Sequence, residues 1–132
     1  LHFEYMVSKD NLSALVSSFA SGTLKGAQRF HLKVKTDTDT VLAILVQEKN
    51  GGRFSAVAAV PKNLWQDIDF SPSELTLGRD KDDPKDANGV LDVDQIETVS
   101  LLDLHTFFIR NEAPELKALF PAITAGPREL WL

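Results

Sequence analysis

The chain contains no cysteine, and this absence excludes disulfide bonds and all thiolate chemistry. Cysteine-free chains occur both in the cytosol and among bacterial secreted domains, so the localisation stays unknown, with an extracellular or secreted protein slightly favoured. The sequence also lacks any apolar run near the roughly 18 residues that a membrane-spanning helix requires, and no stretch resembles a signal peptide. We therefore expect no membrane partner.

Positive charge is scarce, because 14 Lys and Arg residues face 19 Asp and Glu residues and leave a net charge of −5. Nucleic acid requires a dense cluster of Lys and Arg, so we expect no nucleic-acid partner. A length of 132 residues with 43% hydrophobic residues is typical of one globular domain with its own core. We expect a single domain over residues 1–132, excised from a longer protein.

Catalytic signatures are missing too. The sequence has no G-x-S-x-G, H-E-x-x-H, P-loop or G-x-G-x-x-G motif, and its histidines, His2, His31 and His105, are too far apart for a metal motif. Asp67 and Asp69 share one face of a strand, whereas the carboxylates of a glycosidase flank the scissile bond from opposite sides. We therefore expect no enzyme and no catalytic residue.

What the sequence has instead is a series of short alternating apolar and polar stretches, which predict strands. The strands are expected at residues 1–7, 30–35, 41–49, 53–60, 65–70, 97–103 and 128–132. The strongest hairpin signal is the K-N-G-G stretch between the third and fourth of these strands, because its residues tolerate a positive φ. Short helical turns are expected near residues 72–75 and 92–95.

Three segments are less clear in the sequence. Residues 12–19 have helical spacing but are rich in serine, so a turn of helix and an extended loop are equally expected. Residues 107–109 either extend the preceding strand or begin a loop, and residues 113–120 predict a short amphipathic helix. Strands do not alternate regularly with long helices, so the fold class is all-β, an antiparallel β-sandwich with short helical turns.

Trp65 is the most informative aromatic residue. Strict alternation places it on the outer face with Asp67 and Asp69, where an indole beside two carboxylates could stack on a sugar and accept its hydroxyl groups. A bulge at Gln66 would instead turn the indole into the core. Tyr5 and Trp131 lie on apolar strands and are expected in the core.

A second candidate surface consists of the polar side chains that alternate with the apolar ones on neighbouring strands. These residues are His31, Lys33, Lys35, Gln47 and Arg53. On a concave sheet they would line a shallow groove and hydrogen-bond a glycan, and on any other sheet they would form an ordinary solvated face.

The acidic loop invites comparison with a calcium site, since hard cations prefer several oxygen ligands. Its candidate ligands are Asp80, Asp82, Asp83, Asp86, Asn88, Asp92 and Asp94. Aligned on an EF-hand loop, however, these residues place Pro84 at the first position, where a carboxylate is required. We expect a solvated loop, with an irregular calcium site as the alternative.

Several of these stretches together resemble a known family. A hairpin with Asn50 and Gly51, a strand opened by Trp65, a Pro-Ser-x-Leu turn and a Leu-Asp-x-x-Gln-Ile turn follow one another between residues 24 and 104. The matching positions in those two turns and the strand after them are Pro72, Leu75, Leu91, Asp92, Gln95, Ile96 and Asp103. This succession is similar to the galactose-binding-like jelly-roll domains, which include several carbohydrate-binding modules and the complex I intermediate-associated protein type of domain.

The resemblance implies a jelly-roll sandwich and a non-catalytic module that binds a ligand, foremost a carbohydrate, as an accessory domain of a larger protein. A protein-interaction, assembly or bracing domain is the alternative, with a protein as the partner. The expected ligand-binding residues are Trp65, Asp67, Asp69, His31, Lys33, Gln47 and Arg53. Such domains often hold a structural calcium between a segment before the position of Leu1 and a segment after the position of Leu132. The sequence contains neither segment, so we carry over no metal and no cofactor from the resemblance.

Overall fold

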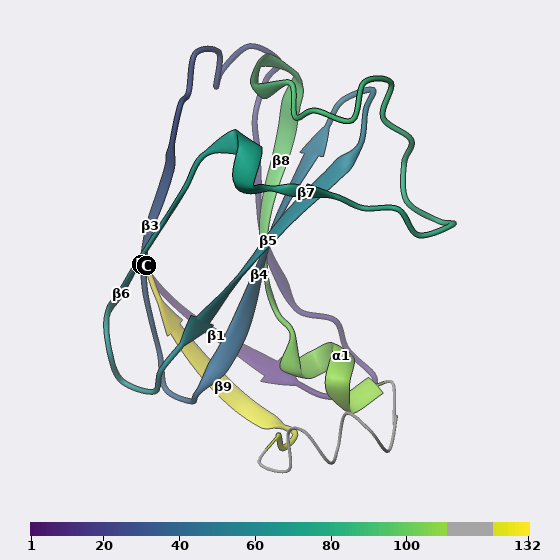
Figure 1. Cartoon of the computed structure of the whole chain (residues 1–132). Helices are drawn as coiled ribbons and strands as arrows, with labels where there is room; N and C mark the ends of the chain where they lie inside the picture. The colour runs from purple at the N-terminus through teal and green to yellow at the C-terminus, as the bar shows by residue number, and fades with distance from the viewer. Residues whose placement is uncertain (111–122) are drawn as a thin grey trace.

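Two antiparallel sheets packed face to face form the molecule, as the computed structural model shows for residues 1–110 and 123–132 (Figure 1). The four-stranded sheet has the order β1 (His2–Val7), β9 (Gly126–Trp131), β3 (Phe30–Thr36) and β6 (Gln66–Phe70). The five-stranded sheet has the order β2 (Ala14–Ser18), β8 (Ile96–Asp103), β4 (Thr40–Glu48), β5 (Arg53–Val60) and β7 (Thr76–Leu77). The predicted antiparallel sandwich is confirmed.

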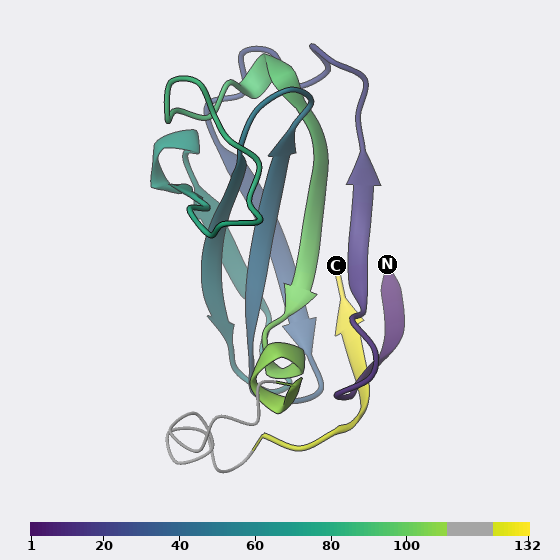
Figure 2. The ribbon, with the colours of Figure 1, turned by 90° about the vertical axis from the view of Figure 1, so that its right-hand side faces the viewer.

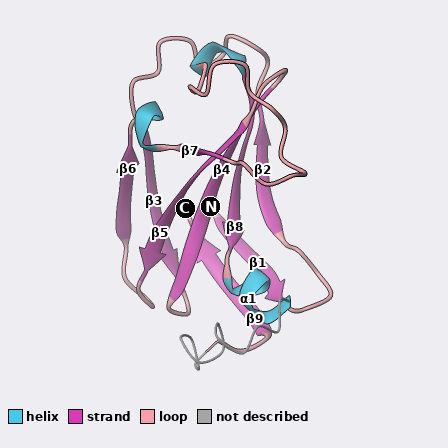
Figure 3. Cartoon of the chain, turned by 45° about the vertical axis from the view of Figure 1, so that its right-hand side comes forward, coloured by secondary structure: helices cyan, strands magenta, loops and turns pink. Residues whose placement is uncertain are grey.

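Helical structure is sparse in the described residues (Figure 3). It consists of two 3-10 turns, η1 (Pro72–Glu74) and η2 (Val93–Gln95), and the helix α1 (His105–Arg110). Both 3-10 turns lie where the sequence predicted a short helical turn. No helix in these parts of the chain is long and apolar enough to cross a membrane.

The alternation along β3 shows how the sequence makes the core. Val34 is fully buried between the sheets, whereas His31 and Lys33 point to solvent from the outer face. The same period of two on β5 buries Phe54 and leaves Val57 66% exposed. Because each strand buries one side of its chain, the two inner faces form two clusters of buried apolar residues, and Leu32, Ile68 and Leu132 pack against both clusters.

The strand β4 occupies the centre of the five-stranded sheet, between β8 and β5. Its apolar residues cover both of its faces, as expected for a strand with neighbours on both sides and a packed inner face. The K-N-G-G turn joins it to β5 in a register that pairs Gln47 with Arg53. The predicted hairpin is therefore confirmed.

Asp103 joins the two sheets at the end of β8. Its buried carboxylate accepts hydrogen bonds from the Tyr5 hydroxyl (2.7 Å), the Thr40 hydroxyl (2.6 Å) and the backbone N–H of His105 (2.9 Å). Burial, followed by the adjacent Asp103 charge, raises the pKa of Tyr5 well above its ordinary value. The tyrosine therefore stays a neutral donor, and its inward orientation agrees with the prediction.

Two local predictions are wrong. Residues 14–18 form the edge strand β2 rather than a helical turn or a loop, because pairing with β8 directs Leu15 against the core. Residues 107–109 belong to α1 rather than to a strand or loop, and the carboxylate of Asp103 binds the N–H of His105 at its first turn. The two-residue strand β7 was not expected. The helix predicted at 113–120 lies outside the described residues.

Candidate functional site

The predicted ligand-binding residues lie on two opposite outer faces. The four-stranded sheet contains His31 and Lys33 on β3 and Asp67 and Asp69 on β6, and Trp65 immediately precedes β6. Gln47 and Arg53 belong to the outer face of the five-stranded sheet. The hypothesis that the polar residues of β3, β4 and β5 line one common groove is therefore wrong, because the whole thickness of the sandwich separates them.

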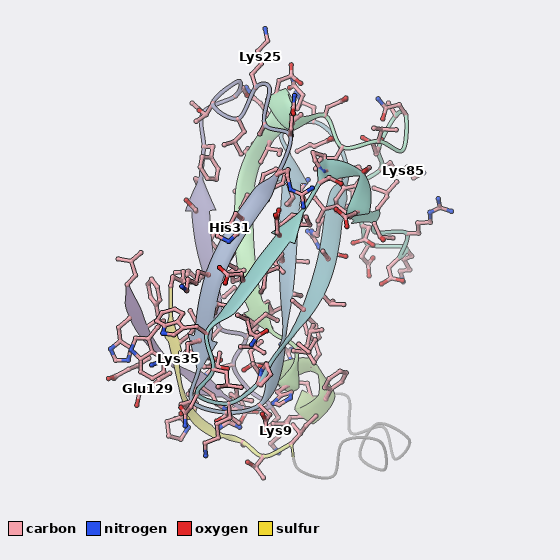
Figure 4. All side chains as sticks on the ribbon, turned by 60° about the vertical axis from the view of Figure 1, so that its left-hand side comes forward. Lys9, Lys25, His31, Lys35, Lys85 and Glu129 are labelled. Carbon is pink, nitrogen blue, oxygen red and sulfur yellow. The ribbon has the colours of Figure 1, made fainter. Side chains whose placement is uncertain are left out.

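Trp65 points outward, so the structure selects the first of its two alternatives. The residue is 47% exposed, and the ammonium groups of Lys33 and Lys35, which project from the outer face of β3, lie 5.9 and 5.4 Å from its ring centroid. Figure 4 shows His31 and Lys35 on this face. No inward bulge is needed, because Gln66 keeps its register with Val34.

Trp131, which was expected in the core, also lies on this outer face. Leu130 takes the buried position on β9, and the alternation of the strand turns Trp131 to the other side. There its ring stacks on the His2 ring at a centroid distance of 4.9 Å and an interplanar angle of 9°. The prediction was wrong because residues 130–132 are all apolar, so their sequence does not show which of them lie on the buried face of the strand.

Asp67 and Asp69 already have partners within the sheet. The His31 ring nitrogen Nε2 lies 3.1 Å from the Asp67 carboxylate, and the Arg29 guanidinium donates to Asp69 at 2.8 Å. The hydrogen bond that Arg29 donates to Asp69, together with the Asp69 charge, raises the pKa of Arg29. These contacts compete with any sugar hydroxyl for the two carboxylates, so the indole is more available than the acids beside it.

On the opposite side of the molecule, the five-stranded sheet carries a hollow with a volume of about 230 Å³. Its lining residues are Leu45, Gln47, Arg53, Thr98 and Ser100. The strand registers set Thr98 beside Gln47 and Ser100 beside Leu45, so that hydroxyl groups border an apolar floor. In Figures 1 and 2, the loop after β7 and the helix α1 project from the upper and lower parts of this side.

Arg53 is held at the rim of this hollow by two neighbours. Its Nε donates to the side-chain amide oxygen Oε1 of Gln47 at 3.3 Å, and its Nη1 lies 3.7 Å from the Asp83 carboxylate of the acidic loop. The Gln47 amide nitrogen is directed back at the backbone carbonyls of the hairpin, with distances of 3.0 to 3.2 Å. Gln47 and Asp83 therefore position Arg53, which forms part of the lining of the hollow.

Two larger openings, of about 400 and 470 Å³, lie at the two edges where the sheets part. Apolar side chains that also face the core supply most of their lining, among them Leu42 and Ile44. In the first opening the polar groups of Tyr5 and Asp103 bind each other. In the second opening, Asp69 binds Arg29 and Glu74 binds Ser71. Because a larger share of both linings is apolar and several of their polar groups are already paired, the polar hollow is the stronger candidate.

The acidic loop uses its carboxylates to order its own backbone. Asp86 accepts from the N–H groups of Asn88 (3.0 Å), Gly89 and Gly52 (3.4 Å), and Asp83 accepts from Asp80 at 2.9 Å. Among the described residues, no group of three or more His, Asp or Glu side chains is arranged to hold a metal ion.

Glu48 is the buried acid of this end of the molecule. Its residue is only 3% exposed, its Oε1 accepts from the N–H of Asp92 at 2.5 Å, and its carboxyl group also contacts Asp86. Glycine is required beside it, since a Cβ on Gly51 would lie 1.8 Å from Glu48 Oε2 and a Cβ on Gly52 would lie 2.9 Å from that of Asp86. The hairpin glycines thus allow two carboxyl groups to meet.

The two acids titrate in opposite directions. Burial raises the pKa of Glu48, opposed by the hydrogen bond from Asp92 and reinforced by Asp86. Burial would raise the pKa of Asp86 too, but the backbone N–H groups of Gly89 and Asn88 and the Glu48 carboxyl outweigh it and lower that pKa. Of the two, Glu48 is therefore the carboxyl group that retains a proton to the higher pH, and in its protonated form it donates to the Asp86 carboxylate.

Replacing Glu48 by glutamine is expected to stabilise the protein by about 1 kcal/mol at neutral pH. Because the pKa of Glu48 is raised in the folded protein, protonated Glu48 stabilises the fold. This stabilisation is complete below pH 4.5, the ordinary pKa, and is lost as the pH rises through the pKa that Glu48 has in the folded protein. The side-chain amide of the Glu48→Gln variant can donate a hydrogen bond to the Asp86 carboxylate at every pH. Urea unfolding should show the two proteins equal near pH 4 and separating as the pH rises. Glu4→Gln, at an exposed position, is the control, and a variant less stable than wild type at pH 7 would contradict the shared proton.

Reasoning from the sequence missed several members of both faces. Thr98 and Ser100 were not among the predicted site residues, because only the apolar residues of this segment were used to predict its strand. Alternation along β8 places both of them on the outer face. Arg29 precedes β3 and had no periodic signal. His2 and Trp131 lie at opposite ends of the sequence, and only the pairing of β1 with β9 brings them together.

Comparison with known proteins identifies the fold. No protein-family model matches the chain, and no curated protein matches it. The family 11 carbohydrate-binding module from Clostridium thermocellum in complex with β-1,3-1,4-mixed-linked tetrasaccharide has a TM-score of 0.66 and 17% identity, over 98% of this chain and 70% of its own. The family 11 module of the cellulosomal cellulase Lic26A-Cel5E of the same organism has a TM-score of 0.64 and 16% identity, over 98% and 69%. The chain therefore has the jelly-roll β-sandwich fold of these modules.

Proposed function

We propose that this chain is a non-catalytic module that binds a carbohydrate on the outer face of the five-stranded sheet, as an accessory domain of a larger protein. The observation that carries the proposal is the polar hollow over Leu45, set on a fold shared with two carbohydrate-binding modules.

The lining of the hollow matches the chemistry of a sugar. The hydroxyl groups of Thr98 and Ser100 both donate and accept, and neither makes a side-chain hydrogen bond within the part of the chain that the structure describes. Arg53 adds several donors from one planar group, already oriented by Gln47 and Asp83. Leu45 offers an apolar floor to the C–H face of the ring.

The affinity of such a site is expected to be modest. The hollow is open, it contains no aromatic residue, and its hydroxyl groups are hydrated before the ligand arrives. Dissociation constants in the micromolar to millimolar range, or about 4 to 8 kcal/mol, are typical of recognition by a few hydrogen bonds. A β-linked glucan is the first ligand to test, since one structural neighbour is described in complex with a mixed-linked tetrasaccharide.

Replacing Arg53 by alanine is expected to weaken binding of a β-1,3-1,4-mixed-linked tetrasaccharide at least about tenfold, because its guanidinium group is the charged donor at the rim. Isothermal titration calorimetry of wild type and Arg53→Ala measures the change. Arg79→Ala is the matched control, since Arg79 is an exposed arginine of the acidic loop outside the hollow. Equal affinities of wild type and Arg53→Ala would contradict the site.

A glycan array with the wild-type chain tests the ligand class independently of any variant. Binding to one or more neutral oligosaccharides is expected, and prolonged incubation should release no new reducing ends. Silence on every glycan, together with a co-purifying protein, would contradict the proposal and favour the assembly role. Release of reducing ends would contradict its non-catalytic part.

A further inference from the structure

The outer face of the four-stranded sheet carries a row of rings and one ammonium group, which we call the Trp-Lys row: His2, Trp131, Lys35 and Trp65. Strand pairing sets Trp131 directly opposite both His2 on β1 and Lys35 on β3. Trp65 immediately precedes β6, whose Gln66 pairs with Val34, and so lies level with Lys35. The row therefore crosses the strands of the sheet from one edge to the other.

Lys35 is the centre of this row. Its Nζ lies 4.4 Å from the ring centroid of Trp131 and 5.4 Å from that of Trp65, so that one ammonium group contacts two indoles. Lys33 places a second ammonium group 5.9 Å from Trp65. Cation–π contacts of this kind hold a flexible lysine in place before any ligand arrives.

These two lysines differ from the other cations of the same face. His2 lies beside Glu129, Arg29 beside Asp69 and His31 beside Asp67, each within ion-pair distance. Within residues 1–110 and 123–132, Lys33 and Lys35 have no carboxylate at ion-pair distance. In a chain with a net charge of −5, the row thus combines exposed indole surface with two ammonium groups that make no ion pair among the described residues, although Asp67 lies opposite Lys33 in the strand pair.

We infer that the Trp-Lys row is a second binding site, for a saccharide that carries a uronate carboxylate. The pyranose ring of a uronate offers a C–H face that an indole can cover, and its carboxylate lies at the rim of the same ring. The ammonium groups of Lys33 and Lys35 stand beside Trp65, where one ligand residue can reach both. A neutral sugar would use the indole and leave the charge without a partner.

The charges around the row also limit the ligand. Asp67, Asp69 and Glu129 border it, and although each is paired, their carboxylates disfavour a densely charged polyanion. An otherwise neutral oligosaccharide with one uronate branch satisfies both conditions. This site is independent of the hollow on the opposite face, so either one can fail without the other.

The test compares two ligands that differ by one uronate residue, a xylo-oligosaccharide with a single glucuronate branch and the unbranched oligosaccharide with the same backbone. By calorimetry, wild type is expected to bind the branched one at least about tenfold more tightly, and a rise in salt should reduce that ratio. Equal binding of the two ligands would overturn the inference. If a glutamate-rich peptide bound as tightly as the branched oligosaccharide, the inference that the ligand is a saccharide would be overturned.

Variants assign the effect to the row. Lys35→Met keeps the apolar stem and removes the charge, and it is expected to reduce the preference to less than about threefold. Trp65→Ala should weaken both ligands. Lys25→Met removes a lysine at the far end of the molecule (Figure 4) and should leave the preference unchanged. A preference that survives Lys35→Met, or disappears with Lys25→Met, would overturn the site. Because Trp65 and Lys35 lie on an outer face, unchanged unfolding midpoints should accompany these results.

Discussion

Replacement of Asp103 by leucine is expected to lower the free energy of unfolding by about 3 kcal/mol or more. Leucine fills a similar volume but leaves the hydroxyl groups of Tyr5 and Thr40 and the N–H of His105 without their acceptor. Thr40 is 5% exposed and His105 is 9% exposed, so water cannot easily replace the lost carboxylate. Urea unfolding followed by tryptophan fluorescence measures the change.

A matched variant separates the buried acceptor from the simple loss of one bond. Tyr5→Phe removes a single donor and keeps the ring between the sheets, so we expect a loss of about 1 kcal/mol. If Asp103→Leu were no more destabilising than Tyr5→Phe, the three bonds could not be holding the sheets together. Asp103 would then be a tolerated buried charge rather than a structural centre.

Truncation of Phe54 to alanine should cost about 4 kcal/mol, because it removes a large side chain that is 1% exposed and leaves a cavity between the sheets. The ring lies opposite Val46 and Leu77 in the sheet and packs in the larger core cluster. The cavity would lie between two hydrogen-bonded sheets, which hold its walls apart, so it can collapse only partly. Thermal and urea unfolding should agree on the size of the loss.

Val57→Ala on the same strand is the control for Phe54→Ala. Its side chain is 66% exposed on the outer face, so its truncation should change the free energy of unfolding by less than about 0.5 kcal/mol. Similar losses for the two variants would mean that β5 does not bury the face assigned to it. The pair therefore tests the orientation of the strand as well as the weight of one core residue.

The strands with strong alternation could be located from the sequence alone. On β3 the apolar set ending in Val34 and the polar set containing Lys33 fall on opposite faces, and a period of two is sufficient to separate them. The strand β2 could not be located in this way. Its Leu15 packs against the core, but the serines of the segment leave no repeated apolar pattern that would indicate a strand. Its strand structure depends on β8, which lies about 80 residues away in the chain.

The candidate sites depend on which strands become neighbours, and local periodicity contains no such information. Gln47 and Arg53 could be paired because a short hairpin fixes their register. By contrast, nothing in the sequence states that β3 and β4, though consecutive, belong to different sheets. That single crossing separates His31 and Lys33 from Gln47, and it divides one predicted groove into two faces.

The position of β9 sets an order on folding during synthesis. Every strand of the five-stranded sheet comes from residues 14–103, so that sheet can pair while the last residues are still being made. In the other sheet, β9 pairs with both β1 and β3, and β1 has no other strand partner among residues 1–110 and 123–132. The strand β1 must therefore wait for β9, and their pairing closes a loop that spans nearly all of these residues, which is the kind of long-range contact that slows folding.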